Sequence, residues 1–466
     1  MLMYMTKVLL LNPPFHGKSY DRVARHDGVT ISGSNWFPIH LAYATGLLEN
    51  HNHAVRFLDA VASHLSPEEV VCETERFSPD IIIVNYSIRS DEEDLAMASE
   101  LKCFGSPVVL VGPSCSIDPS KLLSKSNVDA LVRGEYDFPT LDLAEGKSWK
   151  DIDGLSWKRD HGVIHNPDGH FVTSEQLNDF PFVTDVYRRH LNIRDYFQAP
   201  HLHPFIDLFT GRGCWYGQCT FCLWQNTIYK GAKYRVRKIE NVVSELQFVR
   251  DELPFVKEVF VQDDTLPAWR ARELSSAIME ANIDIVWSCY SRADIDSGTL
   301  RIMKEAGCRA IHVGFESFDL QILKNVKKGI SPWQAERFAK EANKVGLQIH
   351  ADFMLGLPGE DENTIKSTIK WAKGLPVDSY QFIVPKVYPS TPLYDWLMKN
   401  DCLKDGKVNY PHLSNEDLCR WSRIGTRQCV LSRRFITRYA KSILTSPDDF
   451  VRAVRVGFNI LPHILG

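Results

Sequence analysis

Short apolar runs alternate with helix-length segments along the first part of this chain, and the alternation starts again near residue 206. Such alternation is typical of parallel sheets, because two parallel strands need a long crossover that is usually a helix. The apolar runs predict a first series of strands at residues 7–11, 54–59, 80–84, 107–111 and 128–132. The helices between them are expected at residues 39–49, 67–77 and 92–103. We therefore predict that residues 1–145 form an α/β domain with a doubly wound parallel sheet.

The second series of apolar runs predicts six more strands. They lie at residues 206–210, 258–262, 284–290, 310–316, 348–355 and 379–387. Six parallel strands with helical crossovers form a partial or full barrel, whose active site belongs at the carboxyl ends of the strands. We assign this barrel to residues 201–392 and expect residues 393–466 to be helical. Residues 146–200 are expected to be a linker with a hairpin around Gly162.

Polar or glycine-containing loops follow four strands of the first domain. The candidate binding residues in these loops are Asn12, Ser87, Gly112, Gly134 and Glu135. The carboxyl ends of parallel strands meet at one edge of a sheet, so these loops are expected to face one ligand, although such residues also form ordinary turns. A nicotinamide is disfavoured because no G-x-G-x-x-G turn follows the first strand. A corrinoid with a protein histidine under its cobalt is disfavoured because the chain has no D-x-H-x-x-G.

Three cysteines lie within nine residues of a glycine-rich stretch that follows the first predicted barrel strand. Cys214, Cys219 and Cys222 have the spacing C-x4-C-x2-C. Thiolates this close together can hold an iron–sulfur cluster, and the lack of a fourth nearby ligand would leave one iron open to a small molecule. A zinc site is disfavoured because no second Cys or His pair follows. A ferredoxin-type cluster is the stronger alternative, with Cys289 as its distant fourth ligand.

Composition narrows the function classes. A formal net charge of −4 provides no basic field, so no nucleic-acid partner is expected. Eleven cysteines scattered through 466 residues, with no recognisable signal peptide, indicate a reducing cytoplasm. Near the C-terminus, apolar residues share one helical face with arginines beside it, which predicts a helix that packs on the barrel or, as the alternative, gives peripheral contact with a membrane. These residues are Phe450, Val454, Phe458 and Leu461, with Arg452 and Arg455.

With these motifs in this order, the chain resembles the cobalamin-binding branch of the radical SAM enzymes along almost its whole length. The resemblance implies a B12-binding domain followed by a (β/α)6 barrel, with cobalamin, a [4Fe-4S] cluster and S-adenosyl-L-methionine (SAM) as cofactors. It implies that Cys214, Cys219 and Cys222 bind three irons, that SAM chelates the fourth, and that the loops of the first domain contact the corrinoid. The barrel residues that it matches to the cluster and SAM site are Phe221, Gln262, Asp263, Glu316, Gly356 and Pro358.

The resemblance also implies the chemistry. One electron from the cluster would cleave SAM to a 5′-deoxyadenosyl radical that takes hydrogen from an unactivated carbon, and cobalamin would deliver a methyl group to a small-molecule or lipid substrate. The electron would come from an external reductant such as flavodoxin or ferredoxin. Residues 181–184, 219–224 and 410–414 look like the hopanoid-biosynthesis subgroup. That similarity favours an alternative in which the substrate radical rearranges, for example by ring contraction.

One feature departs from the family. Its usual spacing is C-x3-C-x2-C, whereas residues 215–218 make the first gap one residue longer here. An added residue in a glycine-rich loop can bulge outward at modest cost. An alternative of another class is an iron–sulfur or corrinoid carrier without SAM chemistry, which would need a fourth thiolate; a tRNA-modifying enzyme is a further alternative, but no separate basic RNA-binding domain is recognisable. The sequence singles out no catalytic residue and no particular substrate.

Overall fold

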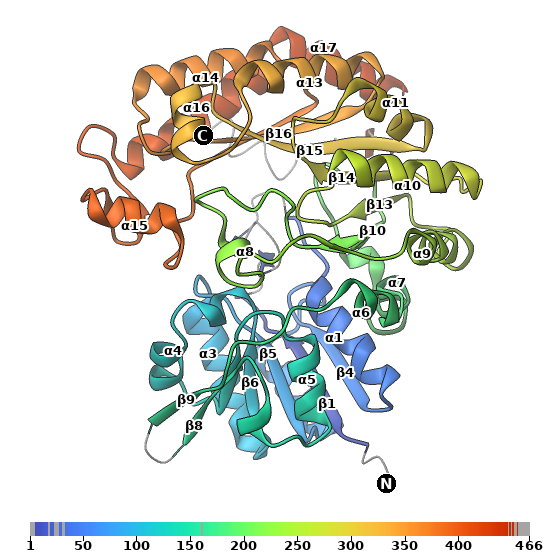
Figure 1. The fold of residues 1–466 in the computed structure, drawn as a ribbon, viewed down its shortest axis with the longest axis vertical. Helices are drawn as coiled ribbons and strands as arrows, with labels where there is room; N and C mark the ends of the chain where they lie inside the picture. The colour runs from blue at the N-terminus through green and yellow to red at the C-terminus, as the bar shows by residue number, and fades with distance from the viewer. Residues whose placement is uncertain are drawn as a thin grey trace. The chain divides into compact units, whose positions relative to one another are not determined.

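The computed structural model describes residues 5–16, 19–22, 28, 29, 33–159, 162–445, 447, 448, 450, 451 and 454. The chain divides into two compact units, each with its own parallel sheet (Figure 1). The first unit comprises Met1–Gln198, Pro204–Leu208 and Trp224–Lys238. The second comprises Ala199–His203, Phe209–Leu223 and Ile239–Gly466.

The sheet of the first unit has the strand order β4-β1-β5-β6-β7-β8-β9. Its parallel strands are β1 (Lys7–Asn12), β4 (Ala54–Asp59), β5 (Ile81–Asn85), β6 (Val108–Val111) and β7 (Ala130–Val132). They confirm the five predicted strands. Because β4 lies on one side of β1 and β5 on the other, the chain reverses its direction of winding between β1 and β5. Ligands of doubly wound sheets bind at such a switch point, beyond the carboxyl ends of the strands.

A hairpin extends this sheet beyond β7. Strands β8 (Leu155–Arg159) and β9 (Gly162–His165) pair with each other, and β8 pairs with β7, both in antiparallel fashion. The hairpin was predicted, but as part of a linker. Instead it covers the β7 edge, whose backbone groups would otherwise lack partners.

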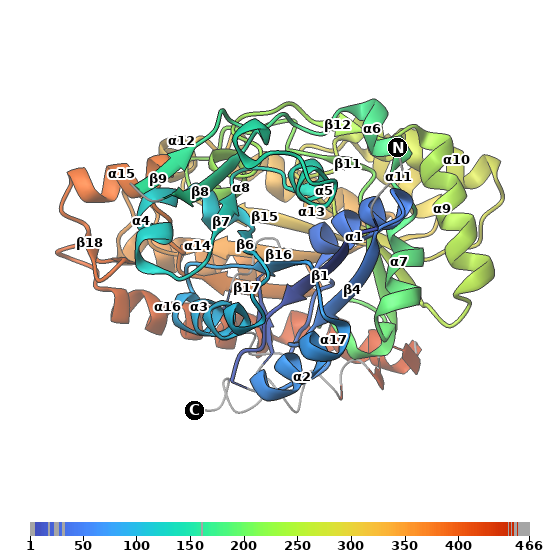
Figure 2. The ribbon, with the colours of Figure 1, turned by 90° about the horizontal axis from the view of Figure 1, so that it is seen from below.

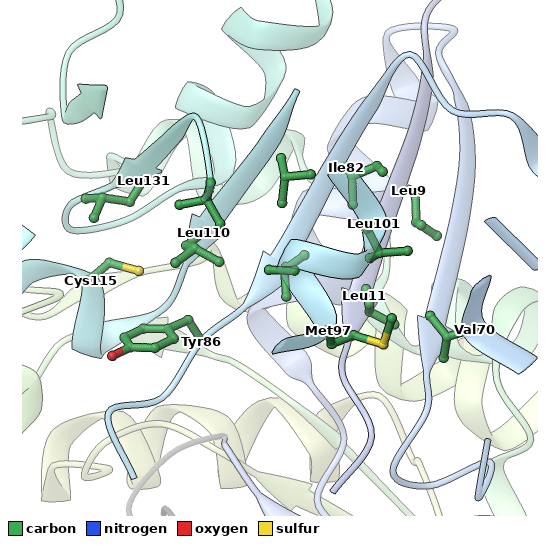
Figure 3. Close-up of a cluster of buried hydrophobic side chains, with 14 of the residues drawn as sticks. Leu9, Leu11, Val70, Ile82, Tyr86, Met97, Leu101, Leu110, Cys115 and Leu131 are labelled. Carbon is green, nitrogen blue, oxygen red and sulfur yellow. The ribbon is translucent and has the colours of Figure 1, made fainter. Parts of the chain in front are cut away.

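Helices cover both faces of the first sheet (Figures 1 and 2). One face packs against α2 (Pro67–Phe77), α3 (Asp91–Glu100) and α4 (Pro119–Lys125), as Figure 3 shows in a buried apolar cluster that includes Leu11, Met97 and Leu110. Helices α1 (Ile39–Asn50), α5 (Asp137–Ala144) and α7 (Val183–His190) lie together on the other side. Because helices cover both faces of the sheet, the polar loops that could bind a ligand lie beyond the carboxyl ends of the strands.

The second sheet has the order β10-β13-β14-β15-β16-β17 and confirms the six predicted strands. The strands are β10 (Phe205–Leu208), β13 (Glu258–Val261), β14 (Trp287–Ser291), β15 (Cys308–Glu316), β16 (Gln348–Met354) and β17 (Ser379–Ile383). Strands β13 to β17 are parallel. The intervening helices are α9 (Ile239–Glu252), α10 (Ala268–Glu280), α11 (Ser297–Glu305), α12 (Leu320–Asn325), α13 (Pro332–Lys344) and α14 (Glu362–Gly374).

The C-terminal region is helical, with one exception. It contains α15 (Pro392–Lys399), α16 (Asn415–Val430) and α17 (Arg433–Thr445), and a small antiparallel hairpin of β18 (Leu403–Lys404) and β19 (Lys407–Val408) that the sequence did not predict. Most of the amphipathic stretch that ends at Leu461 lies outside the described residues. Within the part of the chain that is described, no helix is both long and apolar enough to span a membrane.

Candidate functional site

Asp263 fixes the start of the cysteine loop. Its carboxylate follows β13, is completely buried, and accepts hydrogen bonds from the backbone amide of Thr210 (2.6 Å), the Thr210 hydroxyl (2.5 Å) and the amide of Gly211 (3.2 Å). Hydrogen bonds to a buried carboxylate are among the stronger ones in proteins. Asp263 was predicted to contact SAM, and in the structure it holds the backbone that leads into the loop.

The three thiols of the loop are partly exposed, and none forms a disulfide. The backbone amide of Gly217 donates to the sulfur of Cys214 (3.4 Å), and Gly213 and Gly217 both adopt left-handed conformations that favour glycine. In the described part of the chain, no group of three His, Cys, Asp or Glu side chains converges on one point where a single metal ion would sit. A cubane cluster requires no such point, because each thiolate binds a different iron. The donor set therefore suits a cluster better than one metal ion.

Two cations act on Cys219. Burial raises the pKa of its thiol, and the charges of Lys328 and Arg292 oppose that rise. The Lys328 ammonium donates to one carboxylate oxygen of Glu316 (2.6 Å), and both side chains of this pair are almost fully buried. A positive charge near a thiolate favours the ionised form, which is the form that binds iron. Lys328 and Arg292 thus partly offset the effect of burial on Cys219, while the charge of Glu316 adds to it.

Glu316 lies at the end of β15 in an unusual backbone conformation. Its φ is +63°, beside a register shift between Gly314 and Glu316. The carboxylate folds back over Gly314, where a Cβ atom would come within 2.3 Å of it. Its second oxygen is buried without a hydrogen-bond partner among the described residues. Strained backbone and an unpaired buried acceptor are features of binding sites, and they agree with the predicted role of Glu316 in SAM binding.

Gln262 carries the clearest sign of a missing ligand. Its side chain is 4% exposed, and both its amide nitrogen and its amide oxygen are buried without a hydrogen-bond partner among the described residues. Burying an unpaired amide costs several kcal/mol, so native proteins rarely leave one without a ligand or water. An amide can donate to a carboxylate and accept from an ammonium group. Gln262 therefore fits the amino and carboxylate groups of SAM, and its predicted place at the SAM site stays a prediction.

The loop after β16, residues 356–360, is closed by hydrogen bonds to the side chain of Glu360. The Glu360 carboxylate accepts hydrogen bonds from the amides of Gly356 and Leu357 (3.2 Å for Leu357), and the Pro358 carbonyl accepts from Asn325 (2.8 Å). Gly356 has a φ of +104°, and a Cβ atom there would lie 2.6 Å from Leu418. Leu357 packs in the apolar cluster that also contacts Phe221 of the cysteine loop. Contact of Gly356 and Pro358 with SAM stays a prediction.

Glu360 makes stability depend on pH. Burial raises the pKa of its carboxyl from 4.5 to about 8, although the amides of Gly356 and Leu357 lower it. Between these two pH values the folded protein keeps the proton and the unfolded chain loses it, so the free energy of unfolding falls as pH rises. Over the whole window the loss is on the order of 4 kcal/mol. We expect Glu360→Gln to equal the wild type at pH 5 and to be more stable at pH 9, measured by urea unfolding.

The matched control for Glu360 is Glu362→Gln. Glu362 lies in the first turn of α14, and its side chain is about half exposed. We expect this variant to follow the wild type at both pH values, because the half-exposed pair of Glu362 with Lys366 contributes little to stability. If Glu360→Gln also follows the wild type, Glu360 ionises normally in the folded protein.

In the first unit, the predicted residues Asn12 and Gly112 meet at the switch point. The Asn12 amide donates to Asp59 (2.8 Å), and the Asn85 amide donates to Asn12 (3.4 Å). Gly112 has a φ of +117°, and a Cβ atom there would come within 2.9 Å of the Asn85 side chain. Asp59 also accepts from the Tyr196 hydroxyl (2.8 Å). These hydrogen bonds fix a group of polar side chains at the carboxyl ends of β1 and β5.

A small pocket lies at this edge of the first unit. Asn85, Pro113 and Tyr136 line it from the strand ends, and the His40 ring stacks on Trp224 with 5.3 Å between ring centroids. The pocket is too small to enclose a macrocycle, so a corrinoid could only lie across it. The sequence analysis did not single out His40. It considered only a histidine in a D-x-H-x-x-G motif, which the chain lacks.

Two residues with unpaired polar groups follow pocket-lining residues in the chain. The Ser114 hydroxyl and both amide atoms of Gln225 are buried and have no hydrogen-bond partner among the described residues. Each follows a pocket residue in the chain, Pro113 or Trp224. A corrinoid carries amide side chains around its ring, which can both donate to and accept from such groups. The donor set therefore fits a corrinoid.

The other predicted corrinoid residues have structural partners. Glu135 forms a two-pronged ion pair with Arg235 (2.6 and 3.1 Å) and accepts from the Val172 amide (2.8 Å). The Gly134 amide donates to the Ser116 hydroxyl (2.9 Å). The Ser87 amide donates to Asp94 (2.9 Å). These residues fix the shape of the loops, and direct contact with a corrinoid stays a prediction for them.

Two protein families match the chain. Residues 26–142 match the B12 binding domain, and residues 208–372 match the Radical SAM superfamily. The first match covers β4 to β7 and the pocket residues from Pro38 to Tyr136, and the second covers the cysteine loop and strands β13 to β16. The chain is a B12-binding radical SAM protein.

The chain is similar to known proteins over most of their length. The B12-binding radical SAM protein is 29% identical to the uncharacterized methyltransferase PH0819 of Pyrococcus horikoshii, over 86% of this chain and 85% of the relative. It is 25% identical to the cytidylyl-2-hydroxyethylphosphonate methyltransferase of Streptomyces wedmorensis, over 86% and 83%. Its fold is similar to that of TsrM from Kitasatospora setae, a radical S-adenosylmethionine methyltransferase, with a TM-score of 0.70, 18% identity and coverage of 96% and 89%. The hopanoid subgroup stays a prediction from the sequence.

Several residues of this B12-binding radical SAM protein were missed by the sequence analysis. Lys328 stands in a turn where lysines are usually solvated, and Gln225 lies in a short helix with no motif. Tyr216 was noted only as part of the longer cysteine gap. Phe221, predicted at the cofactor site, packs instead on an apolar cluster with Ile322, Val326 and Leu357. Only contacts between distant segments distinguish these residues, and one sequence does not show such contacts.

Proposed function

We propose that this protein is a cobalamin-dependent radical SAM methyltransferase that acts on an unactivated carbon of a small molecule or lipid. The observation that carries the proposal is the loop with three thiols, together with the Gln262 amide, which is buried and has no hydrogen-bond partner among the described residues and precedes the Asp263 that binds the start of the loop. The same chain matches the B12 binding domain and has a small pocket lined by Asn85, Pro113 and Tyr136. The methyltransferases among its relatives support methyl transfer as the outcome.

The protein's own residues would divide the work as follows. Cys214, Cys219 and Cys222 would hold three irons, and Gln262 and the free oxygen of Glu316 would bind the amino and carboxylate groups of SAM. When bound, the cluster and SAM would supply a 5′-deoxyadenosyl radical, and the corrinoid would supply a methyl group. The barrel would orient the substrate carbon and exclude water. An external one-electron reductant of the flavodoxin or ferredoxin kind would be its partner.

The four-thiolate alternative has little support. Its distant ligand would be Cys289, which is completely buried on β14. Burial raises the pKa of the Cys289 thiol well above its usual value, and a contact with Cys308 raises it further. Such a thiol stays protonated and is a poor iron ligand. We therefore leave the electron carrier without SAM chemistry as an outcome of the test below.

Rearrangement without methyl transfer is the second candidate. The stretches at residues 181–184, 219–224 and 410–414 favour it, because they look like the hopanoid-biosynthesis subgroup. Under this alternative the protein keeps both cofactors, and only the fate of the substrate radical changes. A cytoplasmic location is part of both candidates. Peripheral membrane contact stays a prediction under either candidate, because most of the C-terminal stretch that suggested it lies outside the described residues.

Counting nucleoside products separates the candidates. We expect anaerobically reconstituted protein, with cobalamin, SAM, a reductant and the right substrate, to release 5′-deoxyadenosine and S-adenosylhomocysteine in equal amounts and to add one methyl mass to the substrate. The matched control is Cys222→Ala. Candidate substrates include polycyclic lipids with a ribose-like side chain. The readout is liquid chromatography with mass detection.

The other outcomes have clear meanings. 5′-deoxyadenosine without S-adenosylhomocysteine and without added mass would replace the methyltransferase proposal by rearrangement. If neither nucleoside forms under reducing conditions, even in slow turnover without substrate, the protein is a carrier without SAM chemistry.

A further inference from the structure

The longer cysteine gap of this chain has a structural counterpart in Tyr216. Its hydroxyl donates to the Lys327 carbonyl (2.6 Å), and its ring lies under the Arg292 guanidinium, 3.8 Å from ring centroid to carbon. The ring also packs directly on Gly329: a Cβ atom at residue 329 would lie 2.2 Å from the phenol oxygen. Tyr216 is therefore fixed by a hydrogen bond, a cation–π contact and close packing, and only glycine at residue 329 leaves room for its ring.

The same segment holds the loop at two more points. The Thr220 amide donates to the Val326 carbonyl (3.1 Å). Phe221 packs on Ile322 and Val326 in the small apolar cluster described above. The turn that follows α12, residues 326–329, thus contacts the loop on both sides of Cys219. We call this turn the loop seat.

The loop seat also brings a charge to the loop. Lys328 lies between the two residues that contact Tyr216, and its ammonium pairs with Glu316. The Arg292 guanidinium donates to the Lys328 carbonyl (2.8 Å), so the cation that lies on Tyr216 also fixes the seat. Lys328 is 8% exposed, and a charge shielded from water acts over a longer distance than a solvated one.

We propose that Tyr216 is a positioning residue of the cluster loop: by binding the loop seat, it fixes the segment around Cys219 against the turn that carries the Lys328 ammonium, which stabilises the added electron of the reduced cluster. The inference rests on the proposed cluster and extends it. The inference gives a role to residues 215–218, the gap between Cys214 and Cys219 that is one residue longer than the usual family spacing. The electron itself comes from the external reductant, and Lys328 changes only the potential at which the cluster accepts it.

The test compares Tyr216 variants after anaerobic reconstitution. We expect Tyr216→Ala to weaken cluster binding roughly tenfold, as is typical when a group that supports metal ligands is removed, and to make the midpoint potential more negative. Tyr216→Phe, which keeps the ring on Arg292 and Gly329 but loses the hydrogen bond, should lie between it and the wild type. Iron content and a redox titration followed by electron paramagnetic resonance are the readouts.

Further variants separate the position of the cluster loop from the charge of Lys328. Trp215→Phe changes the neighbouring residue of the same gap, which is 42% exposed, and should behave as the wild type. Lys328→Met should make the midpoint more negative, and Lys328→Arg, which keeps the charge, should restore it. Cobalamin uptake and thermal unfolding report on the fold. If Tyr216→Ala lowers the unfolding temperature, Tyr216→Phe decides the question.

Each outcome has one reading. Wild-type iron content and midpoint in both Tyr216 variants would overturn the inference, and so would an unchanged midpoint in Lys328→Met. A wild type that binds no cluster overturns the inference and the proposed function together. A wild type that binds the cluster but cleaves no SAM overturns the proposed function alone.

Discussion

Replacing Cys219 by alanine is expected to abolish the [4Fe-4S] cluster, SAM cleavage and methyl transfer. A cluster with an open iron has only three protein ligands, and the loss of one leaves two thiolates, too few to hold a cubane. Cys214→Ala and Cys222→Ala should have the same effect. Iron and sulfide content, the visible absorption of the cluster and 5′-deoxyadenosine release measure the loss.

The matched control is Cys289→Ala. Cys289 is buried on β14, and the ferredoxin alternative needs it as the fourth ligand. We expect this variant to keep the iron content of the wild type. Loss of the cluster in Cys289→Ala would revive the four-thiolate carrier. A full cluster in Cys214→Ala would show that the longer gap has displaced this thiol from the ligand set.

The largest loss of stability is expected from Glu258→Gln. Glu258 is completely buried at the start of β13, where its carboxylate binds both Arg309 (2.9 and 3.0 Å) and His201 (3.0 Å). Burial alone raises the pKa of Glu258, but Arg309 and His201 bring it well below its ordinary value. Glutamine keeps the shape and removes the negative charge that pairs with the buried Arg309 guanidinium. Breaking a buried pair in this way costs about 3–5 kcal/mol.

Hydrogen exchange of the second unit measures this effect directly, since a two-unit chain need not unfold in one step. We expect the amides of β13 and β14 to exchange faster in Glu258→Gln. The control is Lys366→Gln, which breaks a half-exposed pair with Glu362 one turn away on α14 and should cost about 0.5 kcal/mol or less. Equal exchange in Glu258→Gln and the wild type would mean that the network around Glu258 adds nothing to stability.

The sequence predicted the fold because its main signals are local. Apolar runs such as Val108–Val111 are completely buried strands, and the helices between them have regular lengths. The exceptions have physical reasons. Helix α1 is buried over ten of its twelve residues and so lacks an amphipathic pattern. The β8–β9 hairpin is recognisable, but nothing in its own residues shows that it pairs with β7.

The candidate site was predicted less completely. The three thiols and Gln262 stand in motifs at strand ends, where residue type and position coincide. The left-handed backbone of Glu316 depends on a register shift between β15 and β16, and the Lys328 charge reaches the loop only through the turn after α12. Asp263 was assigned to a ligand, yet its carboxylate binds Thr210 and Gly211. Such roles depend on contacts between distant segments, which residue patterns do not encode.

The loop seat also sets an order of events during synthesis of the chain. Tyr216 and its partner Lys327 are 111 residues apart. While the ribosome is still making the helices between Tyr216 and Lys327, the three thiols have already been made but the loop seat that contacts their loop has not. Contacts this distant in sequence form late, because the intervening chain must be ordered first. Iron can therefore be held in the final geometry only after residues 326–329 have been made, which gives the nascent thiols a period without the support of the loop seat.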